Sequence, residues 1–284
     1  METIQSLEHL NANQLYEAFR EAFKDYDIQL SQPELEVMIS RRGFVPELSF
    51  GAFADDRLAS FTLNGIGLFN GMKTAYDTGT GTIESFRGQG LASRIFQYSV
   101  PELKKAGVQQ YLLEVLQHNT GAVSVYRKQG FQVTREFNFF VEQVHNVHLE
   151  KYNLPSGYAI RHIDLNLKSQ MMDCQDFMPS WQNSFESVER RLSDFRMWGV
   201  FAAEELVGYC IFEPNSGDIT QIAVAPSHRN QGLASCLLRE AVQTNRHKNL
   251  KLINTDVACE NITSWAKSIG LAQQGRQFEM LREI

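Results

Sequence analysis

An internal repeat constrains the fold of this chain more than any other feature. Residues 87–93 read RGQGLAS, and residues 229–235, which lie 142 positions later, read RNQGLAS, so six of the seven positions are identical. Further upstream, residues 50–61 resemble residues 198–209 at an offset of 148. Ordered matches in both halves indicate a duplicated unit. Because 284 residues suit two domains of about 140 residues better than one, we predict two copies of one fold.

Hydrophobic spacing predicts the same order of elements in both halves. Leu15, Phe19 and Phe23 have the spacing of a helix, whereas short apolar or alternating runs indicate strands. We expect Pro101 to kink or split the helix after the first repeated segment, because proline lacks an N–H. The predicted fold class is α/β in the α+β sense, a mixed sheet with helices on both faces. The expected strands are 3–7, 48–54, 58–63, 75–82 and 111–115, then 158–163, 199–203, 206–212, 218–224 and 252–257.

The two copies set the expected domain boundaries. The first domain is predicted at residues 1–144 and the second at 156–284, with a linker at 145–155 that ends in Leu-Pro-Ser-Gly. The two offsets differ by six residues, which predicts a longer loop or hairpin in the first half, around Asn70 and Gly71.

Composition and charge narrow the class of protein. A hydrophobic content of 43% and a charged content of 21% are typical of a globular domain. The net charge of −6 disfavours nucleic acid and anionic lipid as partners and leaves room for a cationic small molecule. The N-terminus has neither the basic nor the apolar region of a secretory signal, and no apolar run is long enough to span a membrane. Four cysteines without CxxC spacing predict buried free thiols, so we expect a cytoplasmic protein.

The repeated segment has the pattern of a phosphate-binding loop. A predicted strand leads into Arg-x-x-Gly-x-Ala and then into an amphipathic helix, once at Arg87 and once at Arg229. Glycine lets the backbone approach a ligand, and the first N–H groups of a helix have no partners within the helix. Together with the helix dipole they favour an anion such as pyrophosphate. A glycine turn before a core helix is the structural alternative, which two copies in matched contexts disfavour.

Both loops resemble the Arg/Gln-x-x-Gly-x-Gly/Ala pyrophosphate loop of the GCN5-related N-acetyltransferases. The resemblance implies that acetyl-CoA or coenzyme A is the cofactor, that the loop amides hold its pyrophosphate, and that the preceding strand pairs with its pantetheine arm. It also implies that a backbone N–H near Thr82 or Ile83 polarises the acetyl carbonyl. The implied cofactor-binding residues are Thr82, Ile83, Arg87, Gly88, Gln89, Gly90, Leu91 and Ala92, with an alternative second site at Val224, Arg229, Asn230, Gln231, Gly232, Leu233 and Ala234.

A second signature distinguishes the two halves. The resemblance implies that Asn119 helps to bind CoA and that Tyr126 protonates the departing thiolate. In the second half Asn261 remains, but it precedes Gly270 by two residues fewer than Asn119 precedes the matching glycine, and no tyrosine stands at the equivalent place. We therefore expect two residues to be missing from the short helix of a degenerate second copy. The residues of the first half that match this family motif are Leu113, Glu114, Val115, Asn119, Ala122, Tyr126, Gly130 and Phe131.

These observations predict an enzyme that transfers acetyl from acetyl-CoA to a primary amine by direct attack, with Tyr126 as general acid in the first half. An attacking amine must lose a proton, and Asp77, Glu84 and Glu114 all border the expected cleft. We prefer Glu114 as the base, with a water relay as an equal account. The expected acceptor is a small-molecule amine, and amino acids, aminoglycosides and protein N-termini stay open.

Two other functions fit the same motifs. The chain could be a non-catalytic sensor or scaffold that binds acyl-CoA, or catalysis could be housed in the second half. No metal is expected, because His145 and His148 lack the carboxylate that would complete a His-Glu-x-x-His pattern.

Overall fold

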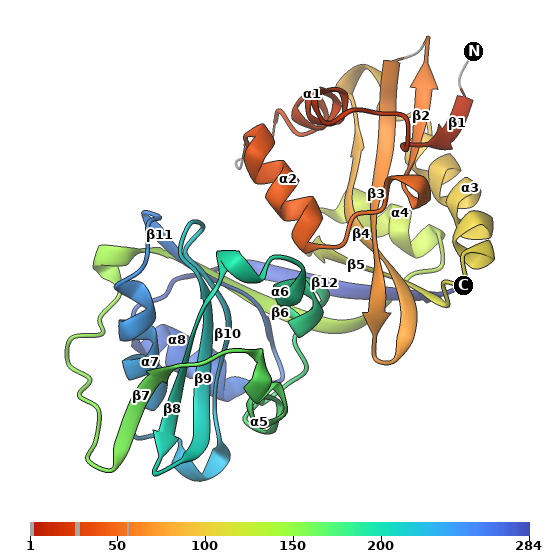
Figure 1. Ribbon diagram of the computed structural model, residues 1–284. Helices are drawn as coiled ribbons and strands as arrows, with labels where there is room; N and C mark the ends of the chain where they lie inside the picture. The colour runs from red at the N-terminus through yellow and green to blue at the C-terminus, as the bar shows by residue number, and fades with distance from the viewer. Residues whose placement is uncertain (1–2, 26–28, 56) are drawn as a thin grey trace. The chain divides into compact units, whose positions relative to one another are not determined.

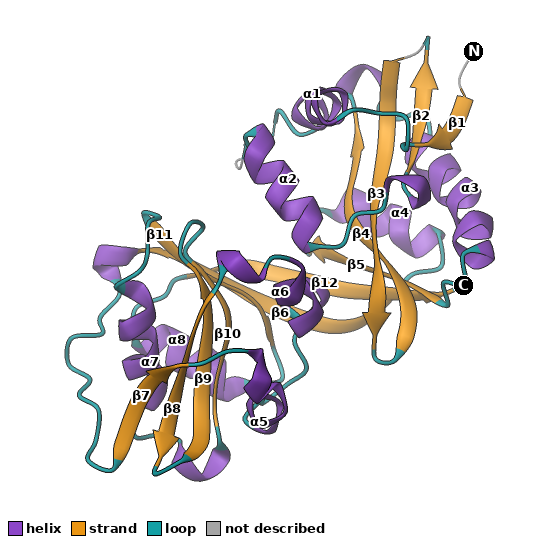
Figure 2. Ribbon diagram, in the orientation of Figure 1, coloured by secondary structure: helices purple, strands orange, loops and turns teal. Residues whose placement is uncertain are grey.

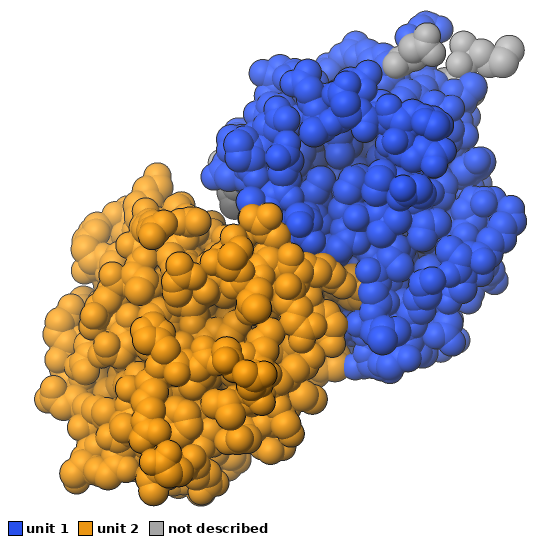
Figure 3. Space-filling model, viewed as in Figure 1, with its two compact units in different colours: residues 1–134, 279–284 blue, residues 135–278 orange. Residues whose placement is uncertain are grey.

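The structure is a computed structural model that describes residues 3–25, 29–55 and 57–284. The chain divides into two compact units, which Figure 3 shows in different colours. Unit 1 comprises Met1–Thr134 and Glu279–Ile284, and unit 2 comprises Arg135–Phe278. These units describe spatial compactness, whereas the domain boundaries predicted from the repeat describe the two sequence copies. The end of the chain therefore completes unit 1.

Unit 1 is built on a mixed sheet. Its first four strands pair with one another antiparallel, and the fifth pairs parallel to the fourth. The expected long hairpin is confirmed: its strands pair as far as Phe69 and Met72, and Asn70 and Gly71 form the turn with φ of 54° and 75°. In spatial order the strands are β1 (Thr3–Ser6), β2 (Phe50–Ala54), β3 (Arg57–Phe69), β4 (Met72–Thr82), β5 (Gln110–Leu116) and the end of β12 (Gln273–Glu283).

Helices cover both faces of this sheet (Figure 2). On one face Leu15 and Phe19 pack with strand residues such as Phe61. On the other face Leu91 and Ile95 pack with strand residues that include Phe50 and Ala52. The first face carries α1 (Ala12–Ala22) and α2 (Gln32–Arg41), and the second carries α3 (Leu91–Lys105) and α4 (Thr120–Lys128).

Pro101 does not split α3. The helix runs unbroken from Leu91 to Lys105, so of the two expected effects of this proline, a kink or a split, the split is wrong. Ile95, Phe96 and Leu103 of α3 are fully buried. Packing of this apolar face outweighs the lost hydrogen bond, because most helical stability in proteins comes from tertiary packing.

Unit 2 repeats the architecture of unit 1 (Figure 1). One face of its sheet packs under the shorter helices α5 and α6, and the other packs under α7 and α8. The strands, in spatial order, are β6 (Gln132–Gln143), β11 (Asn249–Asp256), β10 (Asp218–Val224), β9 (Glu205–Glu213), β8 (Arg196–Ala202) and β7 (Tyr158–His162). The helices are α5 (Lys168–Asp173), α6 (Phe185–Arg190), α7 (Leu233–Val242) and α8 (Glu260–Ser268).

Short 3-10 turns complete the secondary structure, and in the described part of the chain no helix is long and apolar enough to cross a membrane. The turns lie at Pro46–Leu48, Glu84–Phe86, Val144–Asn146, Leu165–Leu167, Trp181–Asn183, Leu192–Asp194 and Pro226–His228.

The parallel strands β4 and β5 pair over only part of their length. Their register runs from Thr74 opposite Gln110 to Tyr76 opposite Leu112 and extends no further. A bulge at Thr78 follows directly, where β4 shifts its register against β3. In unit 2, β10 and β11 share a single registered pair, and a bulge again follows it. Each unit therefore has two neighbouring strands whose carboxyl-terminal ends are not paired with each other.

Met280 tests the contribution of the chain end to unit 1. This side chain is fully buried in the segment that belongs to unit 1. We expect Met280→Ala to lower the free energy of unfolding by about 2–4 kcal/mol, because it leaves a cavity. Hydrogen exchange should become faster in β5 and stay unchanged in β9. Glu283→Ala, at an exposed position of the same strand, is the control. Faster exchange confined to β9 would contradict the assignment.

Candidate active site

The glycine loop of unit 1 is open. Gly90 is the N-cap of α3 with φ of 73°, and Gly88 has φ of 78°. A Cβ built on either glycine meets no described atom within 4 Å. Because a glycine cap offers no side chain to the first N–H groups of the helix, these groups can bind an anion. The loop therefore fits a pyrophosphate.

Arg87 holds this loop on the end of β4. Its Nε donates to the carbonyl of Thr82 at 3.2 Å, and its Nη2 donates to the carbonyl of Ala22 at 3.0 Å. A third group, Nη1, lies 3.2 Å from Oδ2 of Asp25. In unit 2, Nε of Arg229 likewise donates to the carbonyl of Val224 at 2.9 Å. The repeated arginine therefore has a structural task in both copies.

The other loop residues divide between the loop and the core. Nε2 of Gln89 donates to the carbonyl of Ser85 at 3.3 Å, which closes the turn. Leu91 is 2% exposed and packs in the core, whereas Ala92 beside it is half-buried. Among these positions, the backbone rather than the side chains is therefore presented to a ligand.

Thr82 and Ile83 present their amides in different directions. The N–H of Ile83 donates to the carbonyl of Ala59 in β3 at 3.0 Å. Successive amides of a strand point to opposite sides, so the N–H of Thr82 faces away from β3. That is the side where β5 no longer pairs with β4. Of the two amides, the one of Thr82 fits an acceptor in the gap.

Tyr126 lies on α4 with its ring held by two other aromatic rings. The ring centroids of Phe96 and Phe131 are each 5.8 Å away in edge-on geometry. Its hydroxyl donates to Oδ2 of Asp77 at 3.1 Å. Asn119 caps the same helix, because its side chain accepts from the N–H of Ala122 at 3.2 Å. The two residues of the second motif thus lie on one short helix, and Tyr126 reaches β4.

Asp77 is a buried carboxylate with one partnered and one unpartnered oxygen. Oδ2 accepts from Oγ1 of Thr80 at 2.8 Å and from Tyr126. Oδ1 is buried and has no hydrogen-bond partner among the described residues. Burial raises the pKa of the carboxyl to about 6, although hydrogen bonds from Thr80, from Tyr126 and from the backbone N–H of Gly79 act in the opposite direction.

The other two candidate carboxylates lie in different surroundings. Glu114, which we preferred as the base, accepts from the hydroxyl of Tyr76 at 3.2 Å through Oε2, and its Oε1 is buried like Oδ1 of Asp77. Burial, together with the charge of Glu114, raises the pKa of Tyr76 well above its usual range. Glu84 is exposed and forms an ion pair with Lys24. Sequence reasoning missed the contact between Asp77 and Tyr126, for which no local spacing gives a signal.

The loop of unit 2 is covered by its own chain. Tyr152 lies beside Gly232, where a Cβ would approach its ring to 3.1 Å. The hydroxyl of Tyr158 lies 2.8 Å from Nδ1 of His228 and 3.1 Å from Oε1 of Gln231. Within the alternative site, Gly232 and Gln231 are therefore in contact with tyrosines of the same unit, while Asn230 and Gln231 stay exposed.

The arginine of this second loop already forms an ion pair with a carboxylate of the same unit. Nη2 of Arg229 lies 2.8 Å from Oδ1 of Asp176, and the two side chains are 23% and 19% exposed. Asp176 also accepts a hydrogen bond from Asn261, yet burial raises its pKa. The negative charge that a pyrophosphate would bring is already present here.

The short helices α4 and α8 have equal length. Each has nine residues, and their N-caps are Asn119 and Cys259. The expected loss of two residues from the second helix, and the match of Asn261 to Asn119, are therefore wrong. The shortening lies upstream, where α7 has 10 residues and α3 has 15. Because Asn261 was aligned with Asn119, the predicted two-residue gap fell inside the short helix and not upstream of it.

Ala266 takes the place of Tyr126 in unit 2. The N–H of Phe131 donates to the carbonyl of Tyr126 at 3.1 Å, and the N–H of Leu271 donates to the carbonyl of Ala266 at 3.0 Å. These bonds close the two helices in the same way. A methyl group cannot exchange a proton, so the second copy lacks the proposed acid.

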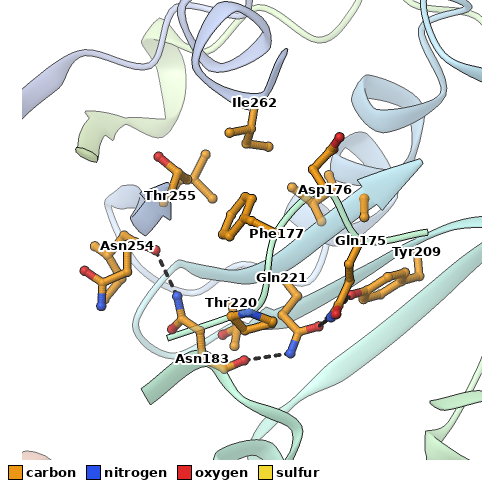
Figure 4. A pocket seen from close by; sticks show the side chains of 15 residues that line it. Gln175, Asp176, Phe177, Asn183, Tyr209, Thr220, Gln221, Asn254, Thr255 and Ile262 are labelled. Carbon is orange, nitrogen blue, oxygen red and sulfur yellow. Dashed lines mark hydrogen bonds between the residues drawn. The ribbon is translucent and has the colours of Figure 1, made fainter. Parts of the chain in front are cut away.

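Unit 2 nevertheless keeps a cleft between β10 and β11, lined by residues that include Gln175, Tyr209 and Gln221 (Figure 4). Polar side chains in this cleft bond mainly to one another. Gln221 accepts from the hydroxyl of Tyr209 at 2.6 Å and donates to the backbone carbonyl of Asn183 at 2.6 Å. Gln175 donates to Tyr209 at 2.9 Å. The cleft is thus a hydrogen-bonded pocket that lacks the tyrosine and aspartate of unit 1.

All four cysteines are free thiols, and three of them are buried, while Cys259 is half-buried. Within residues 3–25, 29–55 and 57–284, no group of three or more His, Cys, Asp or Glu side chains could hold a metal ion.

The chain matches known proteins at the level of family and fold. The sequence profile of the Acetyltransferase (GNAT) family matches residues 12–131 and 168–267. N-alpha-acetyltransferase 30 of Schizosaccharomyces pombe is 32% identical over 110 residues, which cover 36% of this chain and 73% of that protein.

Two solved structures share the fold over the whole chain. The GCN5-related N-acetyltransferase from Sphaerobacter thermophilus has a TM-score of 0.74 at 14% identity and covers 99% of this chain and 95% of its own. A tandem GNAT protein from the clavulanic acid biosynthesis pathway has a TM-score of 0.71 at 12% identity and covers 100% and 98%.

Fold and matches together define an acyltransferase with a duplicated architecture. The chain belongs to the GNAT acetyltransferase family and carries its fold twice. The family relationship predicted from the two repeated loops is confirmed.

The pKa of Asp77 makes the stability of the protein depend on pH. The carboxyl has a pKa of about 6 in the folded protein against an ordinary 3.8. Well below pH 4 it is protonated in both states and makes no difference. Between about pH 4 and 6 the unfolded chain has lost this proton while the folded protein still holds it, so the stability of the folded state falls over this range and stays lower above pH 6. We expect Asp77→Asn to raise the free energy of unfolding by about 2–3 kcal/mol at pH 8 and to change it little near pH 4.

Urea denaturation at both pH values measures this effect. Glu47→Gln, at an exposed carboxylate of unit 1, is the control and should give no difference between the two conditions. A loss of stability at pH 8, or an equal gain at both pH values, would show that the folded protein does not raise the pKa of Asp77.

Proposed function

We propose that unit 1 transfers the acetyl group of acetyl-CoA to a primary amine by direct attack. The observation that carries the proposal is the position of the Tyr126 hydroxyl. It is buried and bonded to Asp77 of β4, next to the point at which β4 and β5 stop pairing with each other. An uncovered glycine loop lies in the same unit. Membership of the GNAT family supports acetyl-CoA as the acyl donor.

The residues of unit 1 fit this donor. The N–H groups at the start of α3 would bind the pyrophosphate, with Gly88 and Gly90 allowing its close approach. The cofactor supplies an acyl group activated as a thioester. The N–H of Thr82 faces the gap and would donate to the acetyl oxygen as it gains negative charge. Arg87 keeps the loop in place for this contact.

Tyr126 would neutralise the departing sulfur. Attack by the amine forms a tetrahedral adduct, and cleavage of the C–S bond leaves a thiolate that must take up a proton. A phenol fixed between Phe96 and Phe131 loses little freedom when it acts. Unit 2 has an alanine at this place, so we assign catalysis to unit 1 and a supporting role to unit 2.

The acceptor is proposed as a small molecule with a primary amine. The name of the Schizosaccharomyces pombe relative points to α-amines, so a panel of amines for assay should include peptides with a free N-terminus beside amino acids and polyamines.

Replacement of Tyr126 tests the catalytic assignment. We expect Tyr126→Phe to lower kcat by about 100-fold, the usual size of a general-acid contribution, and to leave KM for acetyl-CoA within about threefold. Release of free thiol from acetyl-CoA with the amine panel gives both constants. Tyr98→Phe, at a half-exposed tyrosine of α3, is the matched control. If acetyl-CoA binds tightly and no amine raises turnover, the chain is a non-catalytic binding protein instead.

The two N-cap glycines allow a matched test of where CoA binds. Gly90 and Gly232 have φ of 73° and 77°, so the backbone strain of a side chain is similar at either, although a Cβ at Gly232 also approaches the ring of Tyr152 to 3.1 Å. We expect Gly90→Glu to weaken CoA binding by at least about tenfold, because its charge repels pyrophosphate. Gly232→Glu should leave binding unchanged, since Tyr152 already lies beside that glycine.

Isothermal titration with coenzyme A measures both variants. The reverse ranking would place the cofactor in unit 2, and equal losses would mean that both loops bind it.

A further inference from the structure

The hydrogen bond between Tyr126 and Asp77 raises a question about the proposed acid. A phenol has one hydrogen, and here it is directed at Oδ2 of Asp77. While the carboxylate is charged it holds that hydrogen strongly, because charge-assisted hydrogen bonds are the stronger kind. Tyr126 can therefore give its proton to sulfur only when Asp77 ceases to be a strong acceptor.

Asp77 has a second oxygen with the capacity to take a proton. Oδ1 is buried and has no hydrogen-bond partner among the described residues. A buried, unsatisfied carboxylate oxygen is costly in a folded protein and calls for an explanation. A proton accepted at Oδ1 would remove the charge and would weaken the hold of Oδ2 on Tyr126.

Unit 2 shows that the pair is not needed for the fold. Its bulge lies at Thr220 and matches the bulge at Thr78, so Ile219 takes the place of Asp77. Ala266 takes the place of Tyr126. Both members of the pair are absent together from a copy that keeps the strands, the bulge and the loop. This joint absence indicates that the two residues work as one unit.

We infer that Asp77 is the general base of unit 1 and that it controls the proton of Tyr126, an inference that rests on the proposed function. The neutral amine attacks the acetyl carbon, and a C–N bond forms. The adduct's nitrogen then gives one proton to Oδ1 of Asp77. The neutral carboxyl releases the Tyr126 hydrogen, which passes to sulfur as the C–S bond breaks. The phenolate takes the proton of Asp77, so the protein ends unchanged.

The electrostatic surroundings of Asp77 suit this exchange. Burial raises the pKa of Asp77 to about 6, which lets the carboxyl accept and return a proton near neutral pH. Hydrogen bonds from Thr80, from Tyr126 and from the backbone N–H of Gly79 lower it in part, as does the charge of Arg42. The neighbouring phenols of Tyr76 and Tyr111 have pKa values raised well above their usual range by burial, so both stay neutral and are poor proton acceptors. Glu114 accepts a hydrogen bond from the hydroxyl of Tyr76.

The pH dependence of kcat/KM tests the base. Acetyl-CoA and the amine of the panel with the highest turnover serve as probes. We expect an acidic limb near pH 6 in the unaltered protein, because the carboxylate must be charged to accept a proton. Asp77→Asn should lower kcat by about 100-fold and remove this limb. Glu114→Gln is the matched control and should keep it. Loss of the limb in Glu114→Gln alone would overturn the inference.

Thr80 gives a variant that shifts the limb and leaves the base in place. Its hydroxyl lies 2.8 Å from Oδ2, and its hydrogen bond lowers the pKa of Asp77. We expect Thr80→Val to move the acidic limb to higher pH. A residue with a merely structural role would change kcat without moving the limb, and an unmoved limb in an active Thr80→Val protein would therefore count against Asp77.

A titration in the free protein gives a second readout without turnover. In protein labelled with ¹³C in the tyrosine rings, the Cζ signal of Tyr126 should titrate near pH 6, and Asp77→Asn should abolish that step. A signal that does not titrate overturns the shared proton. If no amine in the panel is acetylated, the proposed function and the assignment of a base both fail, and the ¹³C titration still decides whether the pair exchanges its proton.

Discussion

The site of unit 1 depends on the point at which β4 and β5 stop pairing. Parallel pairing ends at Tyr76 and Leu112, and the bulge at Thr78 follows at once. Had the ladder continued, the N–H of Thr82 would have been used within the sheet. Asp77, which lies one residue before the bulge, accepts a hydrogen bond from Tyr126 on α4. The interruption of the ladder thus provides the gap and the free amide, next to a buried carboxylate.

The two copies share this backbone scaffold and differ in the side chains that surround the glycine loop. Both loops keep a left-handed glycine at the helix start and an arginine bonded to the preceding strand. In unit 2, Tyr152 lies on the glycine and Asp176 pairs with Arg229. The geometry that can bind an anion is therefore a property of the fold, whereas access to it is a property of neighbouring side chains.

The sequence predicted the parts of the structure that follow from local pattern. The repeat, the strands and the long hairpin at Asn70 and Gly71 were visible, because periodicity and turn residues act over short distances. The bond between Asp77 and Tyr126 was not, since it joins residues far apart in the chain. The course of α3 through Pro101 depended on packing that no local pattern contains.

The energetics of Asp77 argue that this residue is retained for a reason other than stability. A charged carboxylate with an unpartnered buried oxygen destabilises the folded state. The twin position in unit 2 holds Ile219, which is fully buried and shows that an apolar side chain fits the same place in the sheet. If folding were the sole requirement, the same solution would serve in unit 1. Proteins tolerate local costs of this kind at functional sites, so the contrast between two copies of one fold marks where the chemistry lies.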